Sequence, residues 1–146
     1  MKQPIHILLV EDNEGDVELI ERAFQDGGPP CHISIVNNGM EAMDFLYKRG
    51  EYVHAPTPRL ILLDLNMPRM DGKKFLETVK VDTRLRTIPV VMLTSSQSPS
   101  DIRDCYERQA SCYVVKPFNG KEFADTVRLV INFWTILGQL PQMEAA

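Results

Sequence analysis

The sequence has no long apolar run of the kind that crosses a membrane. A membrane-spanning helix needs about 20 consecutive apolar residues, and every apolar run in this chain is far shorter. A signal peptide is also missing, because Lys2 is followed by Gln3 and Pro4 rather than by an apolar segment. We therefore expect no membrane association and a cytoplasmic location.

Cysteine pairs and basic runs are missing too. The three cysteines (Cys31, Cys105 and Cys112) are an odd number without a metal-binding spacing, which is typical of reduced intracellular thiols. Sixteen basic residues stand against twenty acidic ones, which gives a net charge of −4. Because no basic patch is visible, we expect no nucleic-acid partner.

Short apolar segments alternate with amphipathic ones along the whole chain. The apolar segments, which we predict to be strands, are residues 5–10, 33–36, 60–64, 89–93 and 112–115. A helix is predicted after each strand. The first is stopped by Gly27, Gly28 and Pro29, the fourth begins at Pro99, and the last runs from about residue 121 to about residue 137.

This alternation predicts an α/β fold. Strands that alternate with helices form a parallel sheet covered on both faces. Right-handed crossovers favour a doubly wound, five-stranded, flavodoxin-like sheet with the order 2-1-3-4-5. We expect a single domain over residues 1–146, with a core from about residue 5 to 137 and a short C-terminal tail.

The central strand segment ends in an aspartate. Four large apolar residues, 60–63, run directly into Asp64, and Pro68 follows four positions later. An unbroken apolar run of this length suits a strand that is buried on both faces. Asp64 would then lie at the carboxyl edge of the sheet, where open α/β sheets bind their ligands.

Three other strand ends carry polar residues of complementary chemistry. The first strand ends at Glu11 and Asp12, the fourth at Thr94, and Lys116 follows the fifth. Each of these residues alone would be a common loop or cap residue. Together with Asp64 they would meet at one edge of a 2-1-3-4-5 sheet, where adjacent strands lie about 4.8 Å apart.

These residue types together favour phosphoryl transfer. Three close carboxylates repel one another, and Mg²⁺, which prefers oxygen ligands, relieves that repulsion. Asp64 is a candidate nucleophile for an aspartyl phosphate, with the Thr94 hydroxyl and the Lys116 ammonium as donors to the phosphoryl oxygens.

The strand-end segments closely resemble the receiver domain of two-component response regulators over about residues 5 to 135. The matching segments are Leu-Val-Glu-Asp-Asn at 9–13, Leu-Leu-Asp-Leu-Asn-Met-Pro at 62–68 with Asp-Gly at 71–72, Val-Met-Leu-Thr-Ser at 91–95, and Tyr-Val-Val-Lys-Pro-Phe at 113–118. The resemblance implies a phosphoacceptor without an enzymatic domain, which assists its own phosphorylation and dephosphorylation. It also implies a sensor histidine kinase as partner and, since no second domain is visible, no output domain.

The resemblance assigns a role to each matching residue. Asp64 would be phosphorylated, and Mg²⁺ would be bound by Glu11, Asp12, Asp64 and the backbone carbonyl of Asn66. Thr94 and Lys116 would contact the phosphoryl group. Thr94 and Tyr113 would form the conformational switch, and the bond between Lys116 and Pro117 would be cis.

A narrower resemblance is to the small regulators associated with cyanobacterial and bacterial phytochrome histidine kinases. It depends on three features: the pair Cys112-Tyr113, the proline-containing loop at residues 50–59, and the pair Phe133-Trp134. Cys112 departs from the wider family, which usually has glycine at this position. A phytochrome-type kinase is therefore the expected partner.

The last predicted helix has two apolar stripes. One contains Phe123, Val127, Val130, Ile131 and Trp134, and it suffices to cover the sheet. The other contains Leu129, Phe133, Ile136 and Leu140. The second stripe is either buried within the chain or a surface for a partner, and we favour a homodimer interface.

Two classes of function remain after these observations. The first is a signalling module that is phosphorylated on Asp64 with Mg²⁺ and thereby switches a protein-interaction surface. The second is an interaction module with the same fold that acts without phosphorylation. The intact set of Glu11, Asp12, Asp64, Thr94 and Lys116 favours the first class. A phosphohydrolase would need a second aspartate where this chain has Asn66.

Overall fold

The computed structural model describes residues 4–25 and 30–142, except for the side chain of Leu137. The strands are β1 (Ile5–Val10), β2 (Cys31–Val36), β3 (Leu60–Leu63), β4 (Val90–Thr94) and β5 (Cys112–Val115). The helices are α1 (Glu14–Gln25), α2 (Gly39–Leu46), α3 (Gly72–Val81), α4 (Pro99–Glu107) and α5 (Gly120–Asn132). The predicted stop at Gly27, Gly28 and Pro29 lies outside the described residues.

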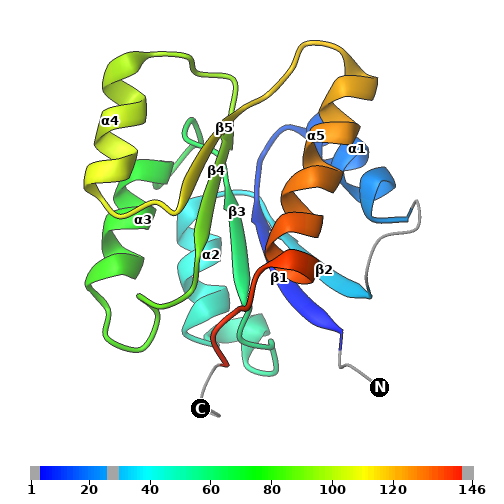
Figure 1. Ribbon diagram of the computed structural model, residues 1–146. Coiled ribbons are helices and arrows are strands. Elements are labelled where there is room, and N and C mark those ends of the chain that lie inside the picture. Colours follow the sequence, from blue (N-terminus) through cyan, green and yellow to red (C-terminus); the bar gives the residue numbers. More distant parts are fainter. Residues whose placement is uncertain (1–3, 26–29, 143–146) are drawn as a thin grey trace.

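The five strands form one parallel sheet in the order β2-β1-β3-β4-β5, which confirms the predicted topology. Helices α1 and α5 lie side by side on one face, and α2, α3 and α4 cover the other (Figure 1). The order of the strands reverses between β1 and β3. In doubly wound sheets this is the point where the carboxyl ends of the strands form a ligand-binding crevice.

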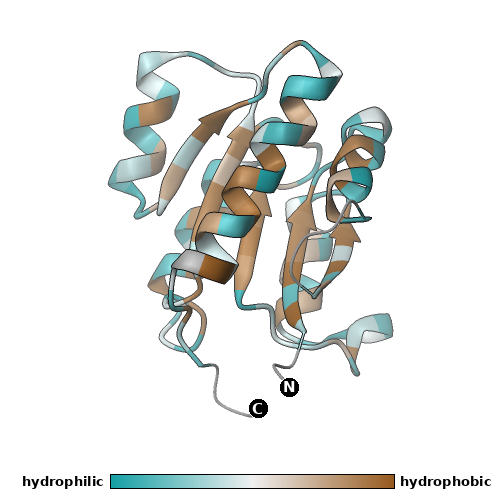
Figure 2. Ribbon diagram, turned by 45° about the vertical axis from the view of Figure 1, so that its right-hand side comes forward, coloured by the Kyte–Doolittle hydropathy of each residue, from teal (hydrophilic) through white to brown (hydrophobic). Residues whose placement is uncertain are grey.

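The core has two halves, one on each face of the sheet. Successive side chains of β3 point to opposite faces: Ile61 and Leu63 pack toward Phe75 of α3, whereas Leu60 and Leu62 pack toward α1 and α5. All four residues of β3 are buried, as expected for a central parallel strand. The brown strands between partly teal helices show this layering (Figure 2).

Side-chain caps begin the helices at the carboxyl edge of the sheet. Asn38, Asp71, Ser98 and Asn119 each accept a hydrogen bond from a backbone N–H of the helix that follows. Asn13 does the same for Asp16 of α1 at 2.9 Å. These caps satisfy N–H groups that lack an intrahelical partner. They therefore fix the helix starts beside the strand ends that carry the polar residues.

Two segments differ from the predictions. The predicted last helix, from about residue 121 to 137, is helical to that end, but α5 stops at Asn132 and its last part, Phe133–Leu137, is a π-helical turn. The Thr135 hydroxyl donates to the Ile131 carbonyl at 2.6 Å, and such side-chain bonds compete with the regular ladder. The loop at residues 50–59 contains a short 3₁₀ helix, Gly50–Tyr52, which begins at a glycine with φ +59°.

None of the helices within residues 4–25 and 30–142 is long and apolar enough to cross a membrane.

Candidate functional site

The acidic residues of two neighbouring strand ends lie together at the switch point. Val10 pairs with Leu63 in the sheet, so Glu11 and Asp64 leave their strands at the same level. Carboxylate oxygens of Glu11, Asp12 and Asp64 lie within 4.8 Å of one another. Glu11 and Asp64 are buried, whereas Asp12 is exposed. Two of the three carboxylates, those of Glu11 and Asp64, are therefore held inside the protein, and that of Asp12 faces solvent.

Lys116 extends into this acidic cluster from the end of β5. Its Nζ donates to both Glu11 oxygens at 3.1 Å and to Asp16 Oδ2 at 2.8 Å. Asp64 Oδ2 is farther from the same Nζ, at 3.8 Å. The Lys116 backbone is held by a hydrogen bond from its N–H to the Thr94 carbonyl at 2.8 Å. Lys116 is thus one ammonium shared among three carboxylates.

Asp16 is a member of this cluster that the sequence reasoning missed. An acidic residue in the first turn of a helix is common, because it interacts favourably with the free N–H groups there, so Asp16 does not stand out in the sequence. Because α1 begins at the same edge of the sheet as the acidic cluster, an acid in its first turn faces the site. That placement is the signal that could have identified it.

Burial and charge shift the ionisation of the site. Burial raises the pKa of Glu11 to about 7, and the charge of Asp64 acts in the same direction, although Lys116 opposes the shift. Burial also acts against the charge of Lys116. The hydrogen bond to Asp16 and the charges of Asp64 and Glu11 outweigh burial and raise the pKa of Lys116. The negative charge of the cluster is only partly balanced by this one ammonium.

This donor set fits a hard divalent cation. Mg²⁺ and similar ions take carboxylate oxygens at about 2.0–2.6 Å, and oxygens within 4.8 Å of one another can share one such ion. The ion would supply positive charge to a phosphoryl group on Asp64. Asn66 is exposed in the loop two residues after Asp64, and its role as a carbonyl ligand stays a prediction.

The loop after Asp64 is held tightly against the start of α3. The Leu65 N–H donates to Asp64 Oδ1 at 2.8 Å, and the Gly72 N–H donates to the Leu65 carbonyl at 2.9 Å. A Cβ at Gly72 would lie only 2.2 Å from the Asp64 carbonyl oxygen. Asp64 therefore lies on a backbone that has little freedom to shift.

Thr94 and Tyr113 both contact Ser96 in the loop between β4 and α4. The Ser96 N–H donates to Thr94 Oγ1 at 3.4 Å, and the Tyr113 hydroxyl donates to the Ser96 carbonyl at 2.9 Å. Thr94 is fully buried and Tyr113 partly buried. The two residues predicted to form the switch are thus coupled through Ser96.

The predicted cis bond between Lys116 and Pro117 is wrong for this structure. Every peptide bond among the described residues is trans. The trans form is intrinsically favoured for a residue before proline. Here the Lys116 side chain reaches Glu11 and Asp16 with the trans bond in place.

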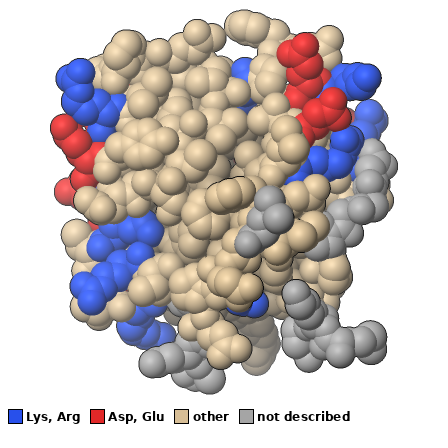
Figure 3. All heavy atoms as spheres, in the orientation of Figure 1, with Lys and Arg blue, Asp and Glu red and all other residues tan. Residues whose placement is uncertain are grey.

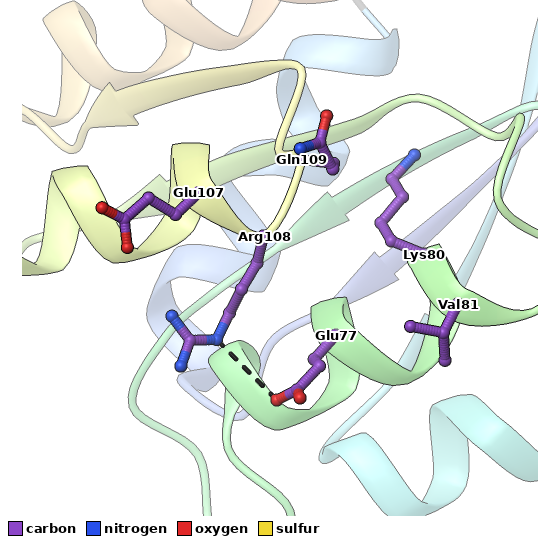
Figure 4. Close-up of a pocket in the computed structure, with 6 residues that line it drawn as sticks. All are labelled: Glu77, Lys80, Val81, Glu107, Arg108 and Gln109. Carbon is purple, nitrogen blue, oxygen red and sulfur yellow. Dashed lines mark ion pairs between the residues drawn. The ribbon is translucent and has the colours of Figure 1, made fainter.

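A separate hollow of about 390 Å³ lies between the carboxyl ends of α3 and α4 (Figure 4). Its two cationic side chains already have partners: Arg108 Nε lies 3.8 Å from Glu77 Oε2, and Lys80 Nζ donates to the Ile88 carbonyl at 2.7 Å. Burial lowers the pKa of Lys80. Because its cations already have partners, this hollow is a poorer ligand site than the acidic cluster.

The fold and the acidic cluster are those of a known class of signalling protein. The profile of the response regulator receiver domain matches residues 7–128. The chain belongs to this family.

Individual relatives narrow the comparison. The response regulator Rcp1 of Synechocystis sp. is 38% identical over 138 residues, which are 94% of each chain. The crystal structure of the phosphorylated cyanobacterial phytochrome response regulator RcpA superposes with a TM-score of 0.92 at 39% identity, covering 96% of this chain and 100% of RcpA. The crystal structure of the Mn²⁺-bound form of Rcp1 superposes with a TM-score of 0.91 at 38% identity. The match covers 95% of this chain and 100% of Rcp1 in that structure.

The comparisons confirm the predicted family and fold. The protein is a response regulator receiver domain, homologous to phytochrome-associated response regulators. Its acidic cluster of Glu11, Asp12 and Asp64 is consistent with the phosphorylation site of such a domain.

Proposed function

We propose that Asp64 accepts a phosphoryl group from a sensor histidine kinase in a Mg²⁺-dependent reaction, and that this modification switches a protein-interaction surface. The observation that carries the proposal is the meeting of Glu11, Asp12 and Asp64 at two in-register strand ends, with Lys116 Nζ 3.8 Å from Asp64. We propose that residues 1–146 form one receiver domain and that it acts in the cytoplasm.

The residues of the site can perform the transfer. An Asp64 oxygen attacks phosphorus and forms an O–P bond, while the P–N bond to the kinase imidazole breaks and its electron pair stays on that nitrogen. Lys116 then neutralises charge on a phosphoryl oxygen. The Thr94 hydroxyl donates its hydrogen to another phosphoryl oxygen; in the resting structure its oxygen accepts from the Ser96 N–H. In this proposal the residues of the receiver domain themselves assist the chemistry.

Phosphorylation of Asp64 can be tested without a kinase. We expect acetyl phosphate with Mg²⁺ to add about 80 Da, the mass of one phosphoryl group, to the intact protein. Asp64→Asn should abolish the adduct. Asp71→Asn is a matched control because asparagine also caps the start of α3, and it should retain the adduct. No adduct on the wild type, or an equal adduct on Asp64→Asn, would favour an interaction module that acts without phosphorylation.

The proposed partner is a phytochrome-type histidine kinase. The support is the similarity to Rcp1 and to RcpA, the latter described as a phytochrome response regulator, along nearly their whole lengths. No nucleic-acid partner is proposed, since the chain carries a net charge of −4 and no basic run.

The second stripe of the last helix supports a proposed homodimer. Leu129, Phe133 and Ile136 are exposed to 71%, 53% and 58%, which contradicts the alternative that they are buried within the chain. Leu140 is only partly exposed. In the orientation of Figure 1, the surface between α4 and α5 carries few charges, which gather at the sides (Figure 3). Exposed apolar side chains such as Leu129, Phe133 and Ile136 are typical of an interface.

A charge in the second stripe should separate such a dimer. We expect light scattering to give the mass of two chains for the wild type and of one for Phe133→Glu, because the new carboxylate would be buried without a partner. Val81→Glu, at another exposed apolar position (75%), should leave the mass unchanged. Equal masses for the wild type and Phe133→Glu would contradict the interface.

A further inference from the structure

We propose that Lys73 is a positioning residue that holds the loop between β4 and α4 in its resting arrangement, and so limits how readily Thr94 reaches a phosphoryl group on Asp64. The link to phosphorylation rests on the function proposed above. The restraint on the loop does not.

Lys73 joins the first turn of α3 to α4 by two ion pairs. Its Nζ lies 2.7 Å from Asp101 Oδ1 and 2.9 Å from Asp104 Oδ2. The Lys73 side chain keeps 30% of its accessible surface, so the pairs are partly shielded from water. One ammonium thus bridges two carboxylates one turn apart on the neighbouring helix.

Asp101 extends this bridge to the loop. Its other oxygen, Oδ2, accepts a hydrogen bond from the Ser96 hydroxyl at 2.6 Å. Ser96 is also the residue that contacts both members of the predicted switch, through its N–H to Thr94 and its carbonyl to Tyr113. A continuous chain of polar contacts therefore leads from Lys73 to Thr94 and Tyr113.

The other end of the bridge is fixed relative to Asp64. Gly72, the residue before Lys73, donates its N–H to the Leu65 carbonyl and fits against the Asp64 backbone with no room for a Cβ. The backbone of Lys73 is therefore held close to the backbone of Asp64. The ion pairs of Lys73 set the distance from this backbone to α4 and, through Asp101, to Ser96.

This arrangement opposes the movement that phosphorylation requires. The Thr94 hydroxyl accepts a hydrogen bond from the Ser96 N–H, so a turn of Thr94 toward a phosphoryl oxygen on Asp64 stretches this contact unless the loop moves with it. Moving the loop draws the Ser96 hydroxyl away from Asp101, which Lys73 holds in place. Removing the Lys73 ammonium lets Asp101 follow the loop and lowers the cost of the movement.

Lys73 and Asp101 stabilise each other's charged form. The hydrogen bonds that Lys73 donates to Asp101 and Asp104 raise the pKa of Lys73, and the hydrogen bonds that Asp101 accepts from Lys73 and Ser96 lower the pKa of Asp101. The bridge is therefore complete under ordinary conditions.

The loop restraint can be tested without any phosphoryl donor. We would incorporate fluorotyrosine, assign the Tyr113 signal with Tyr113→Phe, and record fluorine NMR spectra of Lys73→Met and Lys74→Met. Lys74 is the matched control, since it is the next residue of α3 and its side chain is exposed. We expect Lys73→Met to shift or broaden the Tyr113 signal and Lys74→Met to leave it as in the wild type. An unchanged Tyr113 signal in Lys73→Met would overturn the proposal.

The rate of phosphorylation is a second measurement. An ion pair that only stabilised the fold would not change this rate. With acetyl phosphate and Mg²⁺, we expect Lys73→Met to gain its adduct about threefold to tenfold faster than the wild type, as the loss of one or two partly exposed ion pairs implies. Lys73→Arg, which keeps the charge, should restore the wild-type rate. A rate for Lys73→Met at or below that of the wild type would overturn the positioning role.

The two readouts separate this proposal from the proposed function. If no variant and no wild-type sample gains an adduct, the phosphoacceptor function fails, while the Tyr113 signal still decides whether Lys73 restrains the loop. If Lys73→Met does not fold, Asp104→Asn removes one of the two pairs and should act in the same direction to a smaller extent.

Discussion

Replacing Gly72 with alanine is expected to destabilise the protein by about 3 kcal/mol or more, which is the upper range for forcing an extra methyl group into a filled space. The new Cβ would lie 2.2 Å from the Asp64 carbonyl oxygen and 2.8 Å from Leu65 Cα. Both are backbone atoms, so no side-chain rotation can relieve the clash. The chain at Asp64 would have to shift, and the hydrogen bond from the Gly72 N–H to the Leu65 carbonyl would be lost with it.

Gly120→Ala is the matched control for this prediction. Gly120 is also the first residue of a helix and also follows a capping side chain, that of Asn119. Its added Cβ would meet only the Leu19 side chain, at an ordinary 3.7 Å. Urea unfolding should therefore place Gly120→Ala within about 1 kcal/mol of the wild type, because the folded backbone accepts alanine there. Similar free energies of unfolding for the two variants would show that Gly72 is not a close-approach position.

The strands could be predicted because each is a short apolar run in the sequence. Their order then followed from the rules for right-handed connections in parallel sheets. Residues 60–63 are uniformly apolar, and such a run has few alternatives to a strand buried on both faces. Once the order of the strands was inferred, the meeting of Glu11, Asp64 and Lys116 followed from the geometry of a parallel sheet. The position of the acidic cluster therefore needed no information beyond topology.

Contacts between side chains of distant elements could not be predicted in the same way. Lys116 contacts Asp16 more closely than Asp64, and Lys73 selects Asp101 and Asp104 on another helix. Such choices depend on side-chain lengths and helix positions that no local pattern encodes. The residues at 133–137 illustrate the same limit, because one apolar periodicity fits both a continued α-helix and the π-helical turn that is present.

Replacing Lys116 with methionine should cost about 3 kcal/mol of stability near pH 8 when divalent cations are absent. The variant keeps a long apolar side chain but leaves Glu11, which is only 1% exposed, beside Asp64 without its ammonium partner. Breaking a buried ion pair by removing one partner typically costs about 3–5 kcal/mol, since the remaining charge is uncompensated. Urea unfolding in EDTA would measure the loss. Lys121→Met, at an exposed position near the start of α5, is the control and should change little.

The sign of the pH dependence follows from Glu11. Its pKa in the folded protein, about 7, is above its usual value, so the folded state holds a proton that the unfolded state releases. The stability linked to that proton is complete at low pH and is lost as the pH rises through about 7. Without Lys116 the pKa of Glu11 should rise further, because the charge and the hydrogen bonds of Lys116 lower it. The variant should therefore be closest to the wild type at pH 5 and furthest from it at pH 8, and an equal loss at both would contradict this explanation.

Mg²⁺ should rescue the Lys116→Met variant more than it stabilises the wild type. In the wild type the cation must share the Glu11 carboxylate with the Lys116 ammonium, whose Nζ lies 3.1 Å from both oxygens. The variant offers the same carboxylates without that competing charge. A tenfold tighter dissociation constant adds about 1.4 kcal/mol to the free energy of unfolding at saturating Mg²⁺. If Mg²⁺ raised the two stabilities equally, Lys116 would not be a competitor for the metal ligands, and the acidic cluster would hold the cation through Asp12 and Asp64 alone.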